Sequence, residues 1–260
     1  MRKPRHLWEA WPEFAGACLR ARRAALLTDF DGTLAPIRRR ADAVRLPRSV
    51  ARTLASLVQK GVLVGVISGR SFSDICARVP IRQAWVAGAH GFFLRGPGNR
   101  TFSSLNRSQE RKMMRVARRL ATACSGLRGI RVEDKTAAVA VHYRQAGAGA
   151  ARRAAAAVAA VLSSERGLRR MDGKKVWEVL PATGADKWQA ARRILRRARW
   201  PRHGGLVVYL GDDTTDESVF RKLTGFTVAV GRRRRTAAGY CLESPAEVRR
   251  FLERWNKLLT

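Results

Sequence analysis

The sequence predicts an α/β fold: a Rossmann-like, mostly parallel sheet with a smaller α+β domain inserted into it. Five short apolar runs each end in glycine and polar residues, as strands buried on both faces of a parallel sheet do. The long segment between the third and fourth runs shows a different pattern, and it far exceeds the length of an ordinary connection. With 260 residues, 46% of them hydrophobic, the chain is long enough for both parts.

The five apolar runs predict the strands of the core sheet. They cover residues 24–28, 61–67, 85–87, 205–210 and 226–230. A pattern of helical spacing over residues 47–59 lies between the first two runs, and a strand, a helix and a strand in this order form a parallel crossover unit. The carboxyl ends of such strands lie at one edge of the sheet, so we expect the polar residues that follow them to meet there.

The segment between the third and fourth runs predicts a separate module, which we interpret as an inserted α+β cap domain. It holds a basic helix, a strand with alternating apolar residues, an alanine-rich helix and a last strand, over residues 107–123, 131–144, 150–163 and 174–180. The expected domains are a basic N-terminal leader at 1–23, the first part of the core at 24–104, the cap at 105–182 and the second part of the core at 183–260.

The chain is strongly basic, with 52 Lys and Arg against 20 Asp and Glu and a net charge of +32. Such a charge attracts polyanions, so it raises nucleic-acid binding as a possible function. The basic residues are, however, scattered over every predicted element, and the sequence shows no known nucleic-acid-binding module. We therefore expect a basic surface of biased composition and no specific nucleic-acid partner.

Cysteine usage and the absence of targeting patterns indicate the compartment. Four cysteines lie far apart, without the spacing of a zinc site or a redox pair: Cys18, Cys76, Cys124 and Cys241. No run approaches the roughly 18 apolar residues of a membrane span, and the N-terminal region lacks the apolar core of a signal peptide. We expect a cytoplasmic, monomeric protein with no membrane partner.

Two carboxylates, Asp29 and Asp31, follow the first predicted strand and directly precede a Gly-Thr turn. Burying two unpaired like charges at this place would cost several kcal/mol, so the pair needs a partner such as a cation. Aspartate is also common in turns, so an isolated Asp-x-Asp is weak evidence of such a site. Its position between four apolar residues and Gly-Thr-Leu makes the pair a strong indication of a cation-dependent site.

With this motif the chain resembles the haloacid dehalogenase-like phosphohydrolase superfamily, in which Asp-x-Asp-Gly-Thr follows a buried strand. Three further motifs of that superfamily occur in the expected order. Ser68 in Ser-Gly-Arg matches the second, Lys187 the third, and the Gly-Asp-Asp-Thr-Thr-Asp run at 211–216 the fourth. The long interval between Ser68 and Lys187 is where the cap is inserted.

The resemblance implies phosphoryl transfer to an aspartate. Asp29 would be the nucleophile that forms an aspartyl-phosphate. Asp31 would protonate the leaving alkoxide and then act as base for the water that cleaves the intermediate. Ser68 and Lys187 would bind the phosphoryl oxygens, and Lys187 would also hold the nucleophile.

The same resemblance implies a Mg²⁺ ion as cofactor, because a phosphomonoester is a dianion and its charge must be neutralised before a carboxylate can attack it. The ion would take oxygen ligands from Asp29, from the backbone carbonyl of Asp31 and from Asp212. Asp213 and Asp216 would lie behind these ligands, one of them at a metal-bound water and the other at Lys187.

The cap carries charged residues similar to those of trehalose-6-phosphate phosphatases, a family of this superfamily. By this resemblance, four residues would bind the distal glucose: Glu133, Lys135, Arg144 and Glu178. Further substrate contacts would come from Gly69, Arg70 and His90, the last of them near the sugar phosphate. Paired carboxylates and cations offer acceptors and donors to a sugar rich in hydroxyls. A cross-strand salt-bridge ladder of Glu133, Lys135 and Arg144 is the structural alternative.

Two positions depart from the pattern of that family. Trp188 follows Lys187 where glycine is usual, which would crowd the start of the helix or reshape the cap hinge. Pro181 follows Glu178-Val179-Leu180 where an arginine-proline pair is usual, so one cation is missing on the sugar side.

Three functions follow from these observations. The first is Mg²⁺-dependent hydrolysis of trehalose 6-phosphate, and the second is the same chemistry on another sugar phosphate, such as a sucrose or mannosylglycerate phosphate. The third is nucleic-acid binding on an inactive hydrolase fold, against which the intact set of Asp29, Asp31, Lys187 and Asp212 speaks. Four arginines at 232–235 follow the fifth strand, and we expect them to raise the phosphate concentration at the site.

Overall fold

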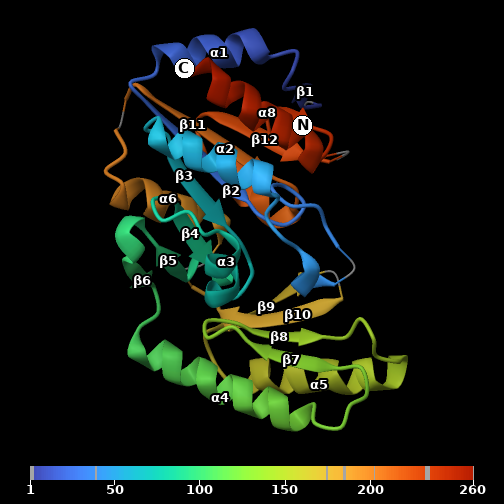
Figure 1. The fold of residues 1–260 in the computed structure, drawn as a ribbon. Coiled ribbons are helices and arrows are strands. Elements are labelled where there is room, and N and C mark those ends of the chain that lie inside the picture. The colour runs from blue at the N-terminus through green and yellow to red at the C-terminus, as the bar shows by residue number, and fades with distance from the viewer. Residues whose placement is uncertain are drawn as a thin grey trace.

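The computed structural model describes residues 3–38, 40–173, 175–183, 186–201, 203–231 and 235–259. These residues form two sheets, a large one in the upper part of Figure 1 and a small one in the lower part. The α/β class expected from the sequence, a mostly parallel sheet with an additional cap, is confirmed. Of the four arginines expected near the site, those at 232–234 lie outside the described residues.

The large sheet is parallel except at one edge. Its strands, in order across the sheet, are β1 (Arg5–His6), β13 (Tyr240–Leu242), β12 (Phe226–Val230), β11 (Gly205–Gly211), β2 (Arg23–Asp29), β3 (Leu63–Ile67), β4 (Trp85–Gly88), β5 (Phe93–Arg95) and β6 (Thr101–Ser103). All neighbours from β1 to β4 pair in parallel, whereas β5 and β6 add an antiparallel edge. The five strands predicted for the core are therefore present, as β2, β3, β4, β11 and β12.

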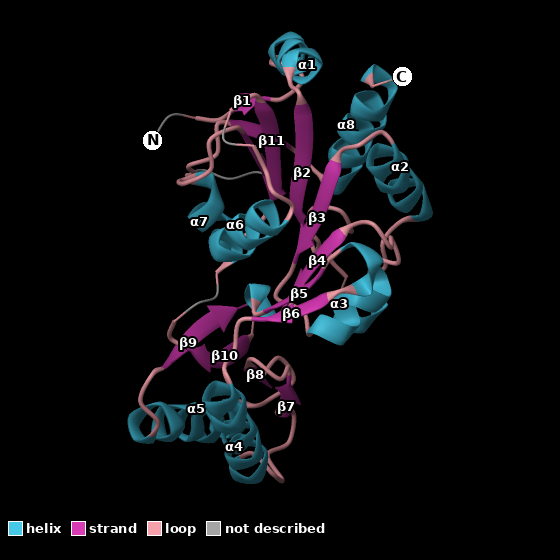
Figure 2. Cartoon of the chain, turned by 90° about the vertical axis from the view of Figure 1, so that its left-hand side faces the viewer, coloured by secondary structure: helices cyan, strands magenta, loops and turns pink. Residues whose placement is uncertain are grey.

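Helices cover both faces of the large sheet, as Figure 2 shows. One layer consists of α6 (Lys187–Arg197) and α7 (Glu217–Phe220). The opposite layer consists of α1 (Trp11–Arg20), α2 (Arg48–Gln59), α3 (Phe72–Arg78) and α8 (Pro245–Leu258). Short 3-10 turns occur at Ala41–Ala43, Ala89–Gly91, Pro97–Asn99 and Thr214–Asp216. Within the described ranges, none of the helices has the length and apolar character that crossing a membrane requires.

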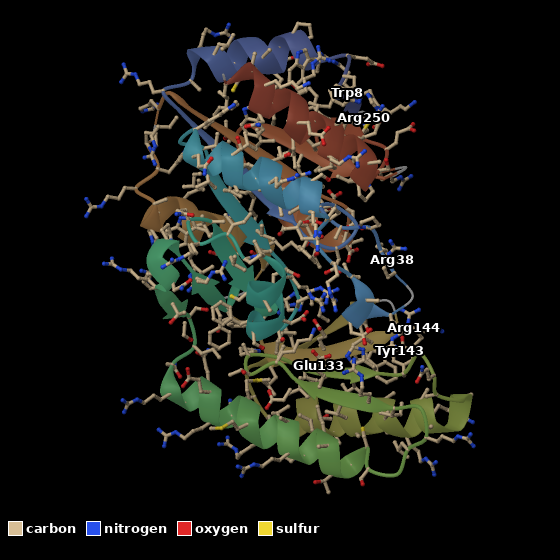
Figure 3. All side chains as sticks on the ribbon, in the orientation of Figure 1. Trp8, Arg38, Glu133, Tyr143, Arg144 and Arg250 are labelled. Atoms are coloured by element: carbon tan, nitrogen blue, oxygen red, sulfur yellow. The ribbon has the colours of Figure 1, made fainter. Side chains whose placement is uncertain are left out.

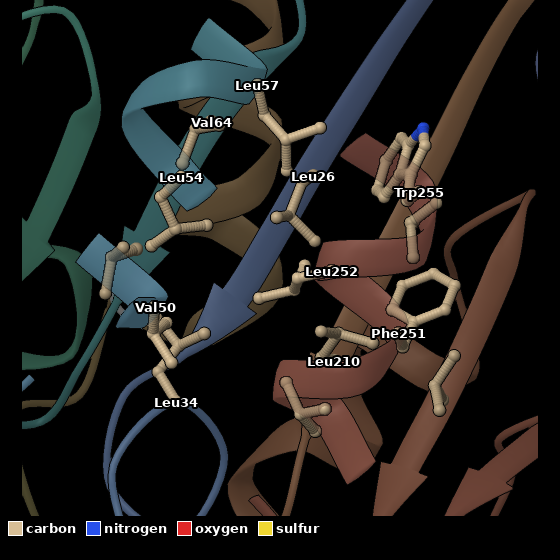
Figure 4. Packing of buried hydrophobic residues seen from close by; sticks show 14 of the residues in the cluster. Leu26, Leu34, Val50, Leu54, Leu57, Val64, Leu210, Phe251, Leu252 and Trp255 are labelled. Carbon is tan, nitrogen blue, oxygen red and sulfur yellow. The ribbon is translucent and has the colours of Figure 1, made fainter. Parts of the chain in front are cut away.

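Alternate residues of β2 pack against opposite helical layers. Leu26 belongs to the cluster that contains Leu54 of α2 and Leu252 of α8, which Figure 4 shows from close by. Leu27 belongs to the other cluster, with Ile194 of α6. All five are fully buried, and each such side chain contributes about 1.5–3 kcal/mol through burial. The strand is thus held from both sides, which fixes the position of the residues at its carboxyl end.

A basic leader is expected from the sequence at residues 1–23, but residues 3–23 form part of the core. β1 pairs in parallel with β13, and α1 packs on the sheet. Phe14 of α1 is fully buried, with its ring 5.2 Å from that of Trp255 and 5.0 Å from that of Phe251. Basic residues on both sides of this helix suggest a leader, but the helix itself carries one basic residue, the exposed Arg20 at its end.

The small sheet and its two helices form the cap, by which we mean the elements from α4 (Arg107–Ala123) to β10 (Val176–Pro181). The antiparallel strand order is β7 (Arg131–Asp134), β8 (Val139–His142), β10 and β9 (Leu168–Gly173). One face of this sheet is directed toward the core, and α4 and α5 (Ala148–Ser164) cover the other face (Figure 1). The cap sheet can therefore line a cleft against the core.

Residues 131–144, expected as one strand, form a hairpin of β7 and β8. The chain turns after Asp134, whose Oδ1 accepts a hydrogen bond of 2.7 Å from the backbone N of Thr136, and Thr136 has a φ of 67°. Neither glycine nor proline marks the turn at residues 134–137, so the two strands resemble a single one in the sequence. As a consequence Lys135 lies in the turn, at the end of the cap sheet that approaches the core.

Candidate active site

Four of the residues expected at the site meet at one edge of the large sheet. Asp29 is the last residue of β2 and pairs in register with Ile67, and Ser68 follows Ile67 directly. Asp212 follows the end of β11, and Lys187 is the first residue of α6. All four expected residues line one cleft of about 970 Å³, which residues of the cap line as well.

Lys187 joins two buried carboxylates. Its Nζ lies 3.0 Å from Oδ1 of Asp29 and 2.8 Å from Oδ1 of Asp216. Burial raises the pKa of Asp29 well above its usual range, although the charge of Lys187 acts to lower it. Burial acts to lower the pKa of Lys187, but the charges of Asp216 and Asp29 outweigh it and raise that pKa. The lysine therefore stays charged beside Asp29.

Asp216 is fully buried and holds Lys187 in place. Its Oδ1 also accepts a hydrogen bond of 2.6 Å from the hydroxyl of Tyr209, and its Oδ2 accepts one of 2.8 Å from the backbone N of Asp213. Burial raises the pKa of Tyr209, so this hydroxyl remains a donor. Asp213 itself is exposed, and its side chain accepts a hydrogen bond from the backbone N of Thr214.

Carboxylate oxygens of Asp29, Asp212 and Asp216 lie within 4.8 Å of one another and could hold a metal ion. Both oxygens of Asp216 already accept hydrogen bonds from protein groups, which leaves Asp29 and Asp212 as the better ligands. Gly32 makes the approach of Asp212 possible, because a Cβ there would lie 2.1 Å from its Oδ2. Burial raises the pKa of Asp212 as well as that of Asp29, and a bound cation would favour the ionised form of both. This set of oxygen donors suits a hard divalent cation.

Asp31 is held by a guanidinium fork. Arg70 donates from Nε to Asp31 Oδ2 at 2.7 Å and from Nη2 to Asp31 Oδ1 at 2.6 Å. Its Nη1 donates to Asp74 at 2.8 Å, and Asp74 also accepts from Nε of Arg78 at 2.9 Å. Arg78 further donates to the carbonyl of Val44, between β2 and α2. Arg70, expected as a substrate ligand, thus orients Asp31.

Ser68 and His90 lie next to each other although they follow different strands. Ser68 is buried after β3, and its Oγ accepts a hydrogen bond of 3.2 Å from the backbone N of Arg70. His90 lies in the turn after β4, where its backbone N donates to the carbonyl of Ser68 at 3.2 Å. Gly69 lies between them and lines the same cleft.

Glu178 of β10 joins the cap to this part of the core. Its Oε1 accepts a hydrogen bond from Nζ of Lys135, and its Oε2 is bound to Nε2 of His90. Lys135 also donates to the carbonyl of Gly69 at 3.1 Å. Three of the expected substrate residues are therefore linked to one another, and all three are buried.

Glu133 lies on the same face of the cap sheet as Glu178, separated from it by Ala140 of β8. Its Oε2 lies 2.9 Å from Nε2 of His142, and the hydrogen bond to this histidine lowers the pKa of Glu133. Arg144 lines the same cleft, and Figure 3 shows it with Glu133 on the cap, below Arg38 of the core. The alternative of a salt-bridge ladder is met only in part, since Lys135 pairs with Glu178 and Glu133 with His142.

The two departures from the family pattern leave the local structure regular. Asp186 caps α6 by accepting a hydrogen bond of 2.7 Å from the backbone N of Gln189, so Trp188 does not disturb the start of the helix. The Trp188 ring packs against the apolar cluster under α6. Pro181 is the last residue of β10.

Three residues of the site were not expected from the sequence: Tyr209, Asp74 and His142. Tyr209 carries a hydroxyl but lies in a buried apolar strand. A buried tyrosine hydroxyl usually has a hydrogen-bond partner, so this residue could have indicated a polar group beside the strand. Asp74 stands four residues after Arg70, a spacing that permits an ion pair on a helix. His142 belongs to the Val-His-Tyr-Arg segment, but the sequence does not show that it faces Glu133.

A model of the family described as trehalose-phosphatase matches residues 27–239 of the chain. The chain belongs to this family. Its site residues fall within the matched range, from Asp29 to Asp216. The structure is similar to that of trehalose-6-phosphate phosphatase from Aspergillus fumigatus, with 27% identity and a TM-score of 0.67 over 98% of this chain and 100% of the other. It also shares its fold with the C-terminal domain of the Candida albicans enzyme, at 22% identity and a TM-score of 0.78 over the full length of both chains.

Curated members of the trehalose-phosphatase family are longer than this chain. Trehalose-phosphate phosphatase of Mycobacterium avium is 34% identical over 91% of this chain, which corresponds to 63% of that protein. A Mycobacterium tuberculosis protein described as an uncharacterized glycosyl hydrolase is 37% identical over 90% of this chain and 18% of its own length. The chain thus spans less than two thirds of these relatives.

The unfolding free energy is expected to fall as pH drops below about 4.5, and Glu178→Gln should remove part of that fall. Burial acts to raise the pKa of Glu178, but His90 and Lys135 outweigh it and lower the pKa from 4.5 to about 2. Because the pKa is lower in the folded state, the carboxylate contributes roughly 3 kcal/mol above pH 4.5, and this contribution is lost between pH 4.5 and 2. Urea unfolding of both proteins from pH 3 to 6 measures the difference. A difference in unfolding free energy between the two proteins that does not change with pH would contradict the prediction.

Proposed function

We propose that this chain is a Mg²⁺-dependent phosphatase that hydrolyses trehalose 6-phosphate to trehalose and phosphate through an aspartyl-phosphate. The observation that carries the proposal is the cleft itself. One wall, from the core, holds buried Asp29 against Lys187, and the other, from the cap, presents Glu133 and Arg144. A phosphate ester that carries a sugar fits such a two-sided site, because each wall matches one half of the molecule.

In the proposed first step, a carboxylate oxygen of Asp29 attacks the phosphorus, and the bond between phosphorus and the sugar oxygen breaks. Asp31 gives a proton to the leaving alkoxide. In the second step Asp31 takes a proton from water, which attacks the aspartyl-phosphate and releases phosphate, so that Asp29 is restored. Lys187 and Ser68 stabilise the charge on the phosphoryl oxygens in both steps.

The donors that would hold Mg²⁺ are the carboxylates of Asp29 and Asp212 and the backbone carbonyl of Asp31. The close approach of Asp212 to Gly32 supports this assignment, since it brings two acidic motifs together at the strand ends. When bound, the ion would neutralise part of the phosphate charge and so permit attack by a carboxylate. Asp216 keeps Lys187 beside Asp29, and Asp213 supports Asp216 through its backbone N.

For the sugar side we propose Glu133, Lys135, Arg144 and Glu178 as ligands of the distal glucose, with Gly69, Arg70 and His90 at the sugar phosphate. All seven line the cleft. Glu133 and Glu178 lie on one face of the cap sheet, two strands apart, so they can accept hydrogen bonds from different hydroxyls of one ring.

The Arg70→Lys substitution is expected to lower kcat/KM by about 100-fold, because misplacing a reacting group by about 1 Å has an effect of that size. A lysine cannot bind both oxygens of Asp31 and one of Asp74 at the same time. Steady-state kinetics on trehalose 6-phosphate measure this loss, with Arg100→Lys at an exposed position as the control. Full activity of Arg70→Lys would show that the fork does not position Asp31.

The proposed function is tested by phosphate release from a panel of sugar phosphates, each with Mg²⁺ and with EDTA. We expect the highest kcat/KM for trehalose 6-phosphate and no turnover in EDTA, with activity restored by excess Mg²⁺. Equal rates for trehalose, sucrose, mannosylglycerate and glucose phosphates would contradict the specific substrate. Turnover that persists in EDTA would contradict the metal requirement.

The alternative substrates remain within the same chemistry, and the panel decides between them. Nucleic-acid binding has no support from the site, where the carboxylates of Asp29, Asp212 and Asp216 cluster at the strand ends. Tight duplex binding at moderate salt would revive it. Cys18, Cys76, Cys124 and Cys241 are free thiols. We propose a cytoplasmic location, where the reducing environment keeps thiols in this state, and a monomer.

A further inference from the structure

Glu178 provides a buried polar contact between cap and core, beside an apolar contact of Ala137, Ala138 and Leu180 with Phe92. This carboxylate is bound to Lys135 through one oxygen and to His90 through the other. Only 6% of Glu178, 8% of His90 and 9% of Lys135 is exposed, so the group is shielded from water. Because the carboxylate is ionised and can only accept, Nε2 of His90 must donate to it. A cap residue therefore fixes the ring of a core residue.

His90 is in turn bound to the loop formed by residues 68–70, which we call the phosphate loop. The backbone N of His90 donates to the carbonyl of Ser68 at 3.2 Å, and the backbone N of Ala89 donates to the carbonyl of Arg70 at 2.6 Å. The imidazole also covers Gly69, where a Cβ would lie 2.6 Å from Cε1 of the ring. The position of the ring and the position of the phosphate loop are thus determined together.

The backbone that carries His90 is strained. Ala89 has a φ of 47°, His90 of 56° and Gly91 of 94°, so three consecutive residues lie in the left-handed region. Residues other than glycine disfavour this region, and such strain persists only where surrounding contacts enforce it. The contacts that hold this turn include the two hydrogen bonds to the phosphate loop, the bond from His90 to Glu178 and a hydrogen bond of 2.6 Å from Nη1 of Arg193 to the carbonyl of Gly91.

We propose that Glu178 is a positioning residue, which acts through His90 to hold the phosphate loop in the arrangement that binds a phosphoryl group. This role is additional to its contact with the sugar, and it rests on the proposed phosphatase activity but not on the identity of the sugar. When the cap leaves the core, the His90 ring loses the partner that the cap supplies, and the phosphate loop loses the support that this ring gives it. Docking of the cap and alignment of the phosphate loop are then one event.

Positioning of the phosphate loop by Glu178 can be distinguished from a role in sugar binding alone. A phosphate ester without a sugar, such as p-nitrophenyl phosphate, has no group for the distal part of the cap. If Glu178 served only as a ligand of the sugar, its substitution would leave this ester and inorganic phosphate unaffected. If Glu178 positions the phosphate loop, both lose binding or turnover.

The test is the Glu178→Gln substitution, which keeps the size of the side chain but cannot accept hydrogen bonds from both Lys135 and His90. With p-nitrophenyl phosphate we expect kcat/KM to fall about 10-fold or more, and with inorganic phosphate plus Mg²⁺ we expect calorimetry to show an affinity lower by a similar factor. His90→Leu should cause the same losses, and the double variant should lose no more than either single one. Circular dichroism confirms that each variant is folded.

Glu165→Gln is the matched control, because Glu165 is a cap carboxylate whose ion pairs, with Arg115 and Arg119, lie within the cap. It should leave both measurements unchanged. Unchanged phosphate affinity in Glu178→Gln, or losses that add in the double variant, would overturn the inference. If the wild type shows no preference for trehalose 6-phosphate but Glu178→Gln binds phosphate more weakly than the wild type does, the proposed substrate is wrong and the inference stands. Should Glu178→Gln not fold, His90→Leu gives the same readouts.

Discussion

The Asp29→Asn variant is expected to lose at least about 10⁴-fold in kcat while folding like the wild type, because it removes the proposed nucleophile and keeps the shape of the side chain. Asp29 lies at the end of a strand that is buried from both sides, so the neutral amide can occupy the same place. Single-turnover phosphate release measures the loss. Asp29→Ala should be equally inactive, and it cannot regain an aspartate by deamidation.

Asp29→Asn, which abolishes activity, is not expected to lower the unfolding free energy. Burial raises the pKa of Asp29, so in the metal-free protein its ionised form destabilises the folded state above the pKa of the unfolded chain, about 3.9. Asp29→Asn should therefore be at least as stable as the wild type at pH 7, and its relative advantage should shrink as pH falls toward 4. Residual turnover above about 1% in the alanine variant would contradict an aspartyl-phosphate.

The Lys187→Met variant is expected to lose both activity and stability. Removing one partner of a buried ion pair leaves uncompensated charge, which costs about 3–5 kcal/mol, and here two carboxylates, of Asp29 and Asp216, lose their cation. The raised pKa of Lys187 means that its contribution is complete below about pH 10.4 and is lost only as the pH rises above that value. Urea unfolding at pH 7 measures the full effect, and kcat should fall by about 10³-fold.

A second substitution separates the two effects of Lys187. The Lys187→Met/Asp216→Asn double variant removes one of the orphaned charges, so it should recover part of the lost unfolding free energy. Its activity should not recover, because the cation beside Asp29 is still missing. Losses of unfolding free energy that simply add in the double variant would show that Asp216 is held by Tyr209 and the backbone, independently of Lys187.

The core strands could be predicted from the sequence because buried parallel strands are continuous apolar runs between polar ends. Strands at the edges could not be predicted in the same way. β1 has two residues, Arg5 and His6, and β9 reads Leu-Arg-Arg-Met-Asp-Gly, so neither shows an apolar run or a clean alternation. The turn at Thr136 lacks the glycine that usually marks a hairpin, and it was missed for that reason.

The site could be predicted in part for a similar reason. Asp29 ends a strand, and Ser68 and Asp212 directly follow strands, so a correct prediction of the strands already brings them to one edge. Pairings between separate elements leave no trace in one sequence. The fork of Arg70 on Asp31 and the bond from His90 to Glu178 depend on how the loops and the cap fold against each other.

The first strand and helix have a consequence for how the protein can be cut. A fragment that begins at residue 24 would leave the backbone N–H and C=O groups along β13 without their partner strand, and it would uncover the rings of Phe251 and Trp255. An open sheet edge beside exposed aromatic rings is a template for pairing between chains. Such a fragment would aggregate even though it retains every residue of the cleft, so a soluble excised domain must begin before Arg5.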